Sequence, residues 1–565
     1  MTSPPTIRLW PLWVVAAVTT ILVILSVTPS IQNAARFMMM MAGPLLGLVL
    51  YLVWQLFFSR MPWKERFLIP ALMILPVALP ALLGDSSMYT AMWIYGVPLA
   101  IVVTAVTLTL FKDWERRRRY VAMGACLLAG WSFFSLSRLD GFDGDYWPEM
   151  AWRWSPTSED LLPDVEVAGG DTAWQLADAE WPGFRGAHAD SRTVAWTAPQ
   201  DWEAAPPQER WRAPVGPAWS SFAYAEGRLF TQEQRGEDEV TSCLDAATGE
   251  RLWEHRVASR FDELVSGSGP RATPTLANGR VYTLGGRGIL SVLDAATGTE
   301  IWQYDLMAKL NAPLPMWGFS SSPVVTEGRV IVHAGPSSEN GLVAFDDNNG
   351  EIVWAVPTRG MNFSSAQLVS FGGEEQVLFG DGNGLFALAP ATGEEIWRYK
   401  PSAWEGPAMV QPQQVGENGL LAALGDGKGT AYMEVERNGD SWQIDEKWSS
   451  IALKPSFNDF VVHDGHIYGY DQNIFASVDL KTGERNWKRG RYGFGQAVLL
   501  AETGQLVVQV EKGDVLLLAA DPEKHRELGR IKALDDKTWN HPIVAGGSLF
   551  VRNGREIVAF DLIPG

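Results

Sequence analysis

A phrase of the form Asp-Ala-Ala-Thr-Gly-x-x-x-Trp recurs through the second half of this 565-residue chain, and it constrains the fold more than any other feature. The copies are Asp245–Trp253, Asp294–Trp302, Asp346–Trp354, Ala389–Trp397 and Asp479–Trp487, with a degenerate copy at Asp440–Trp448. Successive Trp residues are 49, 52, 43, 51 and 39 positions apart. A repeat of about 40–50 residues with short strands and Gly turns is typical of a β-propeller blade. The Gly suits a tight hairpin, and the Trp can fill the space between blades.

The strand that opens each repeat gives the number of blades. Openings lie near Phe222, Pro274, Pro323, Ala366, Pro412, Phe460, Ala497 and Pro542, which makes eight. The last repeat ends without room for its Trp-bearing strand, and Arg210–Arg212 upstream of the first repeat resembles that strand. Pairing the two ends would close the ring and remove exposed sheet edges. We therefore predict an all-β, eight-bladed propeller of four-stranded blades over residues 210–565, closed by the Trp211 strand.

The N-terminal quarter has a different character. Five apolar runs are present: Leu9–Val27, Phe37–Phe58, Phe67–Leu83, Ala91–Phe111 and Tyr120–Leu136. Each approaches the length that an α-helix needs to cross about 30 Å of hydrocarbon, and the third and fifth are the shortest. A cleavable signal peptide would explain only the first run. Residues 1–138 are therefore predicted to be an all-α transmembrane domain of about five helices.

Charge sets the expected orientation of these helices. Residues 1–138 carry 11 basic and 4 acidic side chains, whereas residues 139–565 carry 35 and 61. The basic residues cluster in the second and fourth loops, including Arg116–Arg119. The positive-inside rule places these loops and Met1 in the cytoplasm, and hence the propeller in the periplasm or outside the cell. We expect a multi-pass protein of the bacterial cytoplasmic membrane, in contact with the lipid bilayer.

Composition also excludes several classes of protein. The acidic second part argues against a nucleic-acid partner, because a phosphate backbone selects clustered Lys and Arg. The two cysteines, Cys126 and Cys243, cannot build a disulfide framework. No predicted span carries an ionisable residue near its centre, so a transporter is not expected. Residues 139–209 are acidic and rich in Pro and Trp, and we expect this connector to pack on the propeller or against the membrane face, since disordered segments contain few aromatic residues.

The repeat resembles that of the pyrroloquinoline quinone (PQQ) propeller superfamily, which includes quinoprotein alcohol and glucose dehydrogenases and also the non-catalytic outer-membrane-assembly lipoprotein. Further segments resemble a subgroup of membrane-tethered bacterial PQQ-like proteins without an assigned function. These segments are Trp181–Gly186, Gln232–Gly236, Gly269–Pro274, Trp317–Pro323, Phe457–Phe460 and Thr538–Pro542. Five spans followed by an exported propeller are similar to the layout of membrane-bound quinoprotein glucose dehydrogenase. The chain lacks the adjacent Cys pair of the alcohol dehydrogenases and the long insertions that build their substrate pocket and calcium site.

The positions just before the eight strand openings are all polar. They are Ser221, Thr273, Ser322, Ser365, Gln411, Asp459, Gln496 and His541. Two residues earlier, on the same strand face, lie Trp219, Arg271, Ser320, Phe363, Met409, Phe457, Phe494 and Trp539. The first strand of each blade lines the channel of a propeller, so we expect a polar ring and an aromatic-rich ring near the channel mouth. Such a wall suits a small molecule, although any water-filled channel also needs a polar lining.

Several residues at this predicted mouth are the candidate binding residues: Trp219, Glu233, Arg235, Arg271, Asn458, Asp459, Trp539 and His541. Arg271 can pair with a carboxylate or quinone oxygen, and Asp459 with His541 can act as an acid–base pair. Glu233 and Arg235 are expected in a loop facing the same mouth. If a calcium ion is bound, Asn458 and Asp459 are its candidate ligands.

The sequence thus favours a non-catalytic binding or assembly module without a cofactor, with a protein partner or small molecule at the channel mouth. The alternative is a PQQ- and calcium-dependent dehydrogenase that oxidises an alcohol or sugar and passes electrons to membrane quinone.

Overall fold

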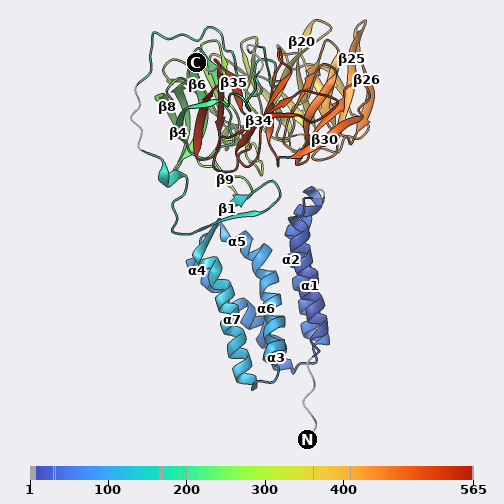
Figure 1. Ribbon diagram of the computed structural model, residues 1–565. Helices are drawn as coiled ribbons and strands as arrows, with labels where there is room; N and C mark the ends of the chain where they lie inside the picture. The colour runs from blue at the N-terminus through green and yellow to red at the C-terminus, as the bar shows by residue number, and fades with distance from the viewer. Residues whose placement is uncertain are drawn as a thin grey trace. The chain divides into compact units, whose positions relative to one another are not determined.

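The computed structural model describes residues 8–29, 31, 33–163, 169–194, 196, 200–360, 362–406 and 409–562. The chain divides into two compact units (Figure 1). The first comprises Met1–Ser155 with Leu264–Gly267, and the second comprises Pro156–Glu263 with Ser268–Gly565. The contacts therefore assign the first part of the connector, up to Ser155, to the helical unit and the rest to the propeller.

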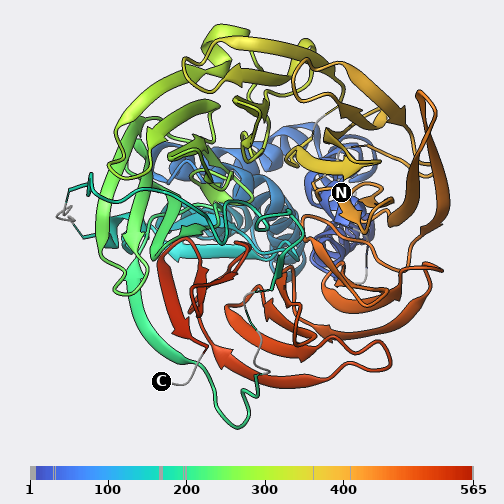
Figure 2. The same ribbon diagram turned by 90° about the horizontal axis from the view of Figure 1, so that it is seen from above.

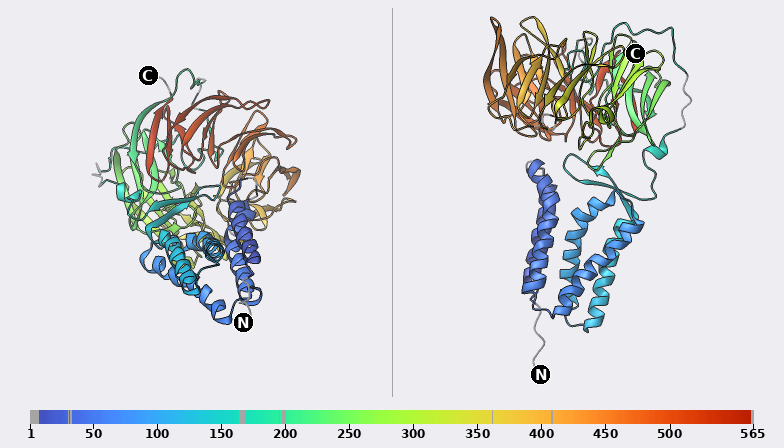
Figure 3. Two further views of the ribbon diagram at one scale, coloured as in Figure 1. Left: turned by 60° about the horizontal axis from the view of Figure 1, so that its bottom comes forward. Right: turned by 180° about the vertical axis from the view of Figure 1, so that it is seen from behind.

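The first unit is a bundle of apolar helices followed by a short hairpin (Figure 3). The helical elements are α1 (Trp10–Ser26), α2 (Asn33–Val53), η1 (Trp54–Phe58), α3 (Trp63–Ile74), η2 (Leu75–Val77), α4 (Ala78–Leu83), α5 (Met88–Ala91), η3 (Met92–Gly96), α6 (Val97–Leu110) and α7 (Arg116–Leu136). The hairpin consists of β1 (Ser137–Phe142) and β2 (Pro148–Trp152).

Among the described residues, four helices are long and apolar enough to cross a membrane, and α1 is a shorter apolar helix of 17 residues. The four are Ala35–Phe58, Trp63–Leu83, Met88–Leu110 and Arg116–Leu136. The third and fifth helices are longer than the apolar runs alone indicate, because basic residues at their N-terminal ends join the first helical turn. The third helix contains a 3-10 turn, η2, at Pro76, a residue that lacks the backbone N–H of a regular helix.

Two ion pairs show which loops lie at the same end of the helical bundle. Arg36, near the start of α2, is buried and lies 3.0 Å from Asp145 in the β1–β2 loop. Arg116, at the start of α7, pairs with Glu65 in the first turn of α3. The loop before α2 and the segment after α7 therefore share one end of the bundle, whereas the starts of α3 and α7 share one end with each other.

The described part of the second unit contains eight antiparallel blades of four strands each, arranged as a propeller (Figure 2), and β3 (Arg192–Thr193) adds a parallel fifth strand to the sheet of the seventh blade. Blade 1 contains β5 (Ala223–Ala225), β6 (Arg228–Arg235), β7 (Asp238–Asp245) and β8 (Arg251–Ala258), and blade 2 contains β11 (Thr275–Ala277), β12 (Arg280–Leu284), β13 (Ile289–Asp294) and β14 (Glu300–Asp305). Blade 3 contains β15 (Val324–Thr326), β16 (Arg329–His333), β17 (Ser337–Asp346) and β18 (Ile352–Thr358), and blade 4 contains β19 (Gln367–Phe371), β20 (Glu374–Asp381), β21 (Gly384–Leu388) and β22 (Glu395–Tyr399). Blade 5 contains β23 (Gln413–Val415), β24 (Gly419–Ala423), β25 (Thr430–Asn438) and β26 (Ser441–Ser450), and blade 6 contains β27 (Phe460–His463), β28 (His466–Asp471), β29 (Ile474–Asp479) and β30 (Arg485–Arg491). Blade 7 contains β31 (Gln496–Leu500), β32 (Gln505–Gln509), β33 (Asp514–Ala519) and β34 (Glu527–Lys532), and blade 8 contains β35 (Ile543–Ala545), β36 (Ser548–Arg552), β37 (Glu556–Asp561) and β4 (Gln208–Pro214). The predicted propeller of eight four-stranded blades is confirmed.

Small elements connect or extend the blades. These are η4 (Glu159–Leu161), β3 (Arg192–Thr193), β9 (Asp262–Glu263), β10 (Gly267–Ser268) and α8 (Leu306–Leu310).

The ring closes by pairing the two ends of the propeller sequence. Strand β4 runs antiparallel to β37, with Trp211 opposite Ala559. The Trp211 indole N–H donates to the carbonyl of Ala246 in blade 1, at 3.0 Å. One side chain thereby links the first and last blades.

The repeated Trp makes the same contact around much of the ring. In five other blades the indole N–H donates to a backbone carbonyl in the turn of the next blade, over 2.8–3.1 Å; the pairs are Trp253–Ala295, Trp302–Asp347, Trp354–Pro390, Trp448–Leu480 and Trp487–Asp521. Trp397 is an exception, since it donates to Gln376 of its own blade. The repeat therefore encodes a hydrogen bond between blades as well as a packed ring.

The turn glycine allows the Trp of the preceding blade to approach. Gly298 has φ of +73°, and a Cβ there would overlap the ring of Trp253. Gly279 has nearly the same φ, +74°, but has open space around its Cβ position. The two glycines share the same backbone requirement and differ in packing.

Replacing each glycine with Ala separates these two effects. The positive φ lowers the free energy of unfolding of both variants by about 1 kcal/mol. Overpacking against Trp253 lowers that of Gly298→Ala by about 1–3 kcal/mol more. Urea unfolding of the full chain, followed by Trp fluorescence, should therefore show a lower midpoint for Gly298→Ala than for Gly279→Ala. Equal midpoints would contradict the packing role of the turn glycine.

Candidate functional site

The eight polar positions before the strand openings form a belt around the channel, and all eight residues are buried. We call Ser221, Thr273, Ser322, Ser365, Gln411, Asp459, Gln496 and His541 the polar belt. The belt is held together by hydrogen bonds from one blade to the next. The backbone N–H groups of Ser221, Thr273 and Ser322 donate to the side-chain oxygens of Thr273, Ser322 and Ser365, over 2.8–3.0 Å.

The same pattern continues on the other side of the ring. The Asp459 N–H donates to Gln496 Oε1 at 3.2 Å, and the Ser221 hydroxyl donates to the His541 carbonyl at 2.5 Å. Buried polar groups are costly unless they are hydrogen-bonded. Much of the belt's polar character is therefore explained by contacts between blades.

The connector enters the channel and completes this network (Figure 2). Arg185 is fully buried, with φ of +64°. Its Nη2 donates to Gln413 Oε1 and to the Phe460 carbonyl, at 2.9 and 2.8 Å. Its Nη1 lies 3.5 Å from Asp459 Oδ1. Burial raises the pKa of Asp459, and the Arg185 charge acts in the opposite direction.

His541 is held by the same segment. Arg185 Nε donates to Ser191 Oγ at 2.9 Å, and Ser191 Oγ lies 2.8 Å from His541 Nε2. The other ring nitrogen, Nδ1, lies 2.6 Å from the Pro542 carbonyl, which can only accept. Nδ1 therefore carries the proton, and Nε2 accepts from the Ser191 hydroxyl. Burial, together with the Arg185 charge, lowers the pKa of His541 to about 3, so the ring is neutral.

The structure brings Asp459 and His541 to the same arginine and places Arg271 in different surroundings. Arg271 lies over the ring of Phe261 at 4.7 Å, with Nη2 3.6 Å from Glu263. Burial lowers its pKa to about 10. The carboxyl of Glu239 is also buried nearby, and burial raises its pKa to about 7.

Four of the five aromatic positions form a continuous cluster, which we call the aromatic mouth: Trp219, Phe457, Phe494 and Trp539. The fifth, Phe363, packs on Trp317, with ring centroids 4.7 Å apart. Ring centroids are 4.7 Å apart for Trp219–Trp539, 5.1 Å for Phe457–Trp539 and 5.4 Å for Phe457–Phe494. The Trp539 indole N–H donates to the buried Glu511 at 2.7 Å. Lys537 Nζ lies 4.7 Å from the Trp539 ring centroid. Phe494 is fully buried, whereas the other three rings are half-buried. The mouth thus combines three partly accessible rings with one ammonium group, an arrangement that suits a planar or apolar ligand.

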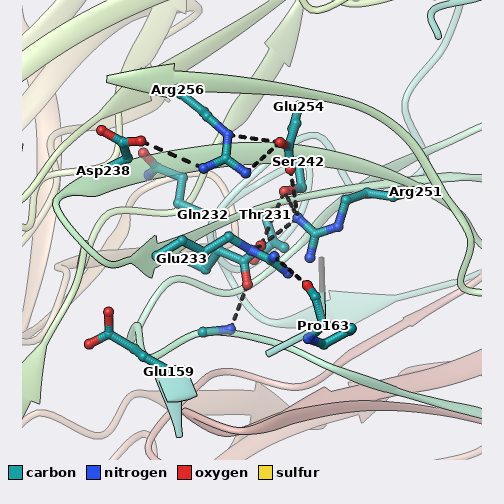
Figure 4. Close-up of polar contacts among 12 residues, drawn as sticks. Glu159, Pro163, Thr231, Gln232, Glu233, Asp238, Ser242, Arg251, Glu254 and Arg256 are labelled. Atoms are coloured by element: carbon teal, nitrogen blue, oxygen red, sulfur yellow. Dashed lines mark hydrogen bonds and ion pairs between the residues drawn. The ribbon is translucent and has the colours of Figure 1, made fainter. Parts of the chain in front are cut away.

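Glu233 and Arg235 lie on strand β6 and not in the expected loop, because β6 continues to Arg235 and pairs with β7 along its full length. Glu233 is fully buried between Arg251 and Arg235 (Figure 4). Burial alone would raise its pKa, but the two guanidinium groups outweigh it and lower the pKa to about 2. The Gly216 N–H also donates to this carboxylate. Glu233 thus balances charge inside blade 1.

Asn458 and Asp459 do not fit a calcium site. The Asn458 amide nitrogen donates to the Gly495 carbonyl at 2.8 Å, and Asp459 faces the Arg185 guanidinium. A cation already occupies the space in front of this carboxylate. Within the described ranges, no three His, Cys, Asp or Glu side chains gather as a possible metal site.

Sequence reasoning did not identify Arg185 or Ser191 as residues of the channel. The motif Trp181–Gly186 lies outside the repeat, so the periodicity of the repeat could not assign the motif to a blade. Arg552 was also missed. It is fully buried and donates to Thr231, Gln232 and Gly216, which joins blade 8 to blade 1.

Comparisons with known proteins agree with this architecture. Residues 236–489 match the sequence model of the family described as outer membrane protein assembly factor BamB (PQQ_2). Comparison with the curated proteins gave no match.

Several solved structures are similar to the propeller of this chain. BamB from Moraxella catarrhalis is 16% identical, with a TM-score of 0.45, and the alignment covers 63% of this chain and 97% of that protein. Quinohemoprotein alcohol dehydrogenase from Comamonas testosteroni is 13% identical, with a TM-score of 0.52 and coverage of 68% and 80%. A europium-containing methanol dehydrogenase is 12% identical, with a TM-score of 0.50 and coverage of 68% and 89%. The second unit thus has the propeller fold of these dehydrogenases, and the matched residues of the family model lie within it.

Proposed function

We propose that this protein is a membrane-anchored, extracytoplasmic binding or assembly module without catalytic activity. The proposal rests on the contacts that Asp459 and His541 make inside the propeller. Asp459 faces Arg185, and both ring nitrogens of His541 are occupied by Ser191 and the Pro542 carbonyl. A general acid or base must exchange a proton with its substrate, and these two groups instead hold the connector in the channel.

The binding surface in this proposal is the aromatic mouth. Trp219, Phe457 and Trp539 are half-buried, so part of each ring remains accessible to a ligand or to a side chain of a partner protein. Aromatic residues are enriched where binding energy is concentrated in protein interfaces. Arg271 stands at the predicted mouth position of blade 2 and contributes a buried positive charge.

The proposed orientation follows from the ends of the helical bundle. The segment after α7 pairs with the start of α2 through Asp145 and Arg36, as expected when the chain crosses the membrane an even number of times between these two points. The starts of α3 and α7 pair through Glu65 and Arg116, beside the basic loops. The positive-inside rule then places those loops in the cytoplasm and the propeller outside it, on the outer face of the bacterial inner membrane.

Cysteine labelling tests this orientation. With Cys126 and Cys243 replaced by Ser, single cysteines at Thr2 and Thr482 should react oppositely with a membrane-impermeant maleimide in spheroplasts. Cysteine at Thr482, in an exposed turn of blade 6, should be labelled, and cysteine at Thr2 should be labelled only after permeabilisation. Labelling of both in intact spheroplasts would contradict five crossings.

One observation favours the second candidate, a PQQ-dependent dehydrogenase that oxidises an alcohol or sugar. The contiguous rings of the aromatic mouth, with Lys537 beside them, suit a flat anionic molecule such as PQQ. When bound, PQQ would supply the redox chemistry. In that case Trp219 and Trp539 would stack on it, and Lys537 would pair with its carboxylates.

A pair of experiments on the full chain separates the two functions. A photo-crosslinking residue at Trp219 should give a discrete adduct with a cellular protein in intact cells, whereas the same residue at the exposed Thr482 should not. PQQ with calcium should give the purified protein neither a bound quinone absorbance nor dye-linked alcohol or sugar oxidation. Quinone binding with oxidation that is lost in Trp539→Leu would overturn the binding-module proposal in favour of the dehydrogenase.

A further inference from the structure

The exposed tryptophans of the described residues all lie in the first unit. They are Trp10, Trp13, Trp63, Trp114, Trp147, Trp152 and Trp154, which are 41–67% exposed. The described tryptophans of the second unit are buried or half-buried. An indole combines an apolar ring with a polar N–H, so it is favoured where hydrocarbon meets water. The exposed indoles therefore indicate where the first unit contacts the surface of a membrane.

These tryptophans fall into two groups at opposite ends of the helical bundle. One group lies beside the starts of α1, α3 and α7: Trp10, Trp13, Trp63 and Trp114. The Arg8 N–H donates to the carbonyl of Ser59, in the loop before α3, so the starts of α1 and α3 lie together. The other group follows the end of α7, in the β1–β2 loop, in β2 and in the turn after it: Trp147, Trp152 and Trp154. Tryptophan is enriched at both surfaces of a membrane, and at one of them the hairpin supplies it.

A backbone hydrogen bond fixes the depth of the second group. The Arg153 N–H donates to the carbonyl of Leu136, the last residue of α7, at 2.9 Å. Helix α7 has 21 residues, so it rises about 31 Å, close to the roughly 30 Å of hydrocarbon in a bilayer. With Arg116 at one edge of the hydrocarbon, Leu136 reaches the other edge. Trp152 and Trp154, on either side of Arg153, lie at that edge.

Trp152 continues the exposed surface of α7. Its ring packs edge-on against that of Phe133, a residue of α7 that is 43% exposed, with ring centroids 6.4 Å apart. Trp152 also stacks on Trp154, with ring centroids 5.4 Å apart and planes within 1° of parallel. Met150 lies on the same face of β2 as Trp152, since alternate residues of a strand share a face, and it is exposed as well. The apolar surface of the predicted span therefore continues onto the hairpin.

The charge of the hairpin shows which lipid contact is available. Residues 137–154 carry four acidic and two basic side chains. Both basic side chains have partners in the same unit, because Arg138 pairs with Asp140 and Arg153 donates to the Leu83 carbonyl. Anionic lipids attract clusters of free Lys and Arg. The contact of this hairpin with lipid thus depends on its rings and not on charge.

We propose that the β1–β2 hairpin is a membrane-interface anchor, in which Trp152 and Trp154 insert between the head groups and the acyl chains of the bilayer. The inference rests on the proposed membrane crossing of the helices, and it adds the partner of this surface, which is lipid.

Depth-dependent fluorescence quenching of the full chain in phosphatidylcholine vesicles tests the anchor. With Cys126 and Cys243 replaced by Ser, single cysteines at Met150, Leu128 and Thr482 carry a nitrobenzoxadiazole label. The quencher is a lipid with a nitroxide either near the head group or near the end of the acyl chain. The Met150 label should be quenched more strongly by the shallow nitroxide and the Leu128 label, within α7, by the deep one. The Thr482 label, in a turn of blade 6, should be quenched by neither.

The outcomes separate the anchor from the membrane crossing. Quenching of neither the Leu128 nor the Met150 label would contradict the crossing of α7 itself. A quenched Leu128 label beside an unquenched Met150 label would place the hairpin in water, where a protein partner could cover it, and would overturn the anchor alone. Quenching of the Met150 label that appears only when phosphatidylglycerol is added would also overturn it, because the contact would then depend on charge.

A double variant tests the two rings directly. Trp152→Ser combined with Trp154→Ser should lower the shallow quenching of the Met150 label to that of the Thr482 label, with the deep quenching of Leu128 retained. Trp10→Ser combined with Trp63→Ser, at the other end of the bundle, should leave the Met150 label as it is in the wild type. Unchanged quenching in the first double variant would show that its rings do not hold the hairpin in the lipid.

Discussion

The guanidinium of Arg185 is the interaction on which the interior of the propeller depends. It is fully buried and joins the connector to blade 5 through Gln413 and to blade 6 through Asp459 and Phe460. Through Ser191 it also reaches His541 of blade 8. An isolated charge in such a place would cost many kcal/mol. The Gln413 side-chain oxygen, the Phe460 carbonyl and the Asp459 carboxylate surround the guanidinium and compensate its charge.

These contacts give the polar residues of the channel a structural role. A ring of polar side chains in a propeller suggests a site, but here the belt joins blades and holds the connector. A surface that remains available to a ligand is the aromatic mouth, which offers aromatic rings beside Lys537.

The sequence predicts the ring well because the blade-to-blade contact is repeated. Each Trp covers the turn Gly in the next copy of the nine-residue phrase, so the periodicity locates both residues. The Trp211 strand could be inferred in the same way, because the last repeat has no Trp-bearing strand of its own. In contrast, Arg185 meets Asp459 across more than 270 positions, and no periodic signal connects them. Glu233 and Arg235 were expected in a loop but lie on β6, and the ion pair of Glu233 with the buried Arg251 explains why a strand tolerates this buried carboxylate.

Replacing Arg185 with Met tests the central claim most directly, with Arg192→Met, an exposed position of the same connector, as the control. Urea unfolding of the full chain should show a loss of about 3–5 kcal/mol for Arg185→Met, since it leaves Asp459 buried and unpaired, and almost none for Arg192→Met. Without Arg185 the pKa of Asp459 rises further above its ordinary value of 3.8. The folded state then binds the proton more tightly than the unfolded state, so stability falls as pH rises through the folded pKa. The account predicts a smaller loss at pH 5 than at pH 8. A loss that is equal at the two pH values, or no larger than that of Arg192→Met, would contradict it.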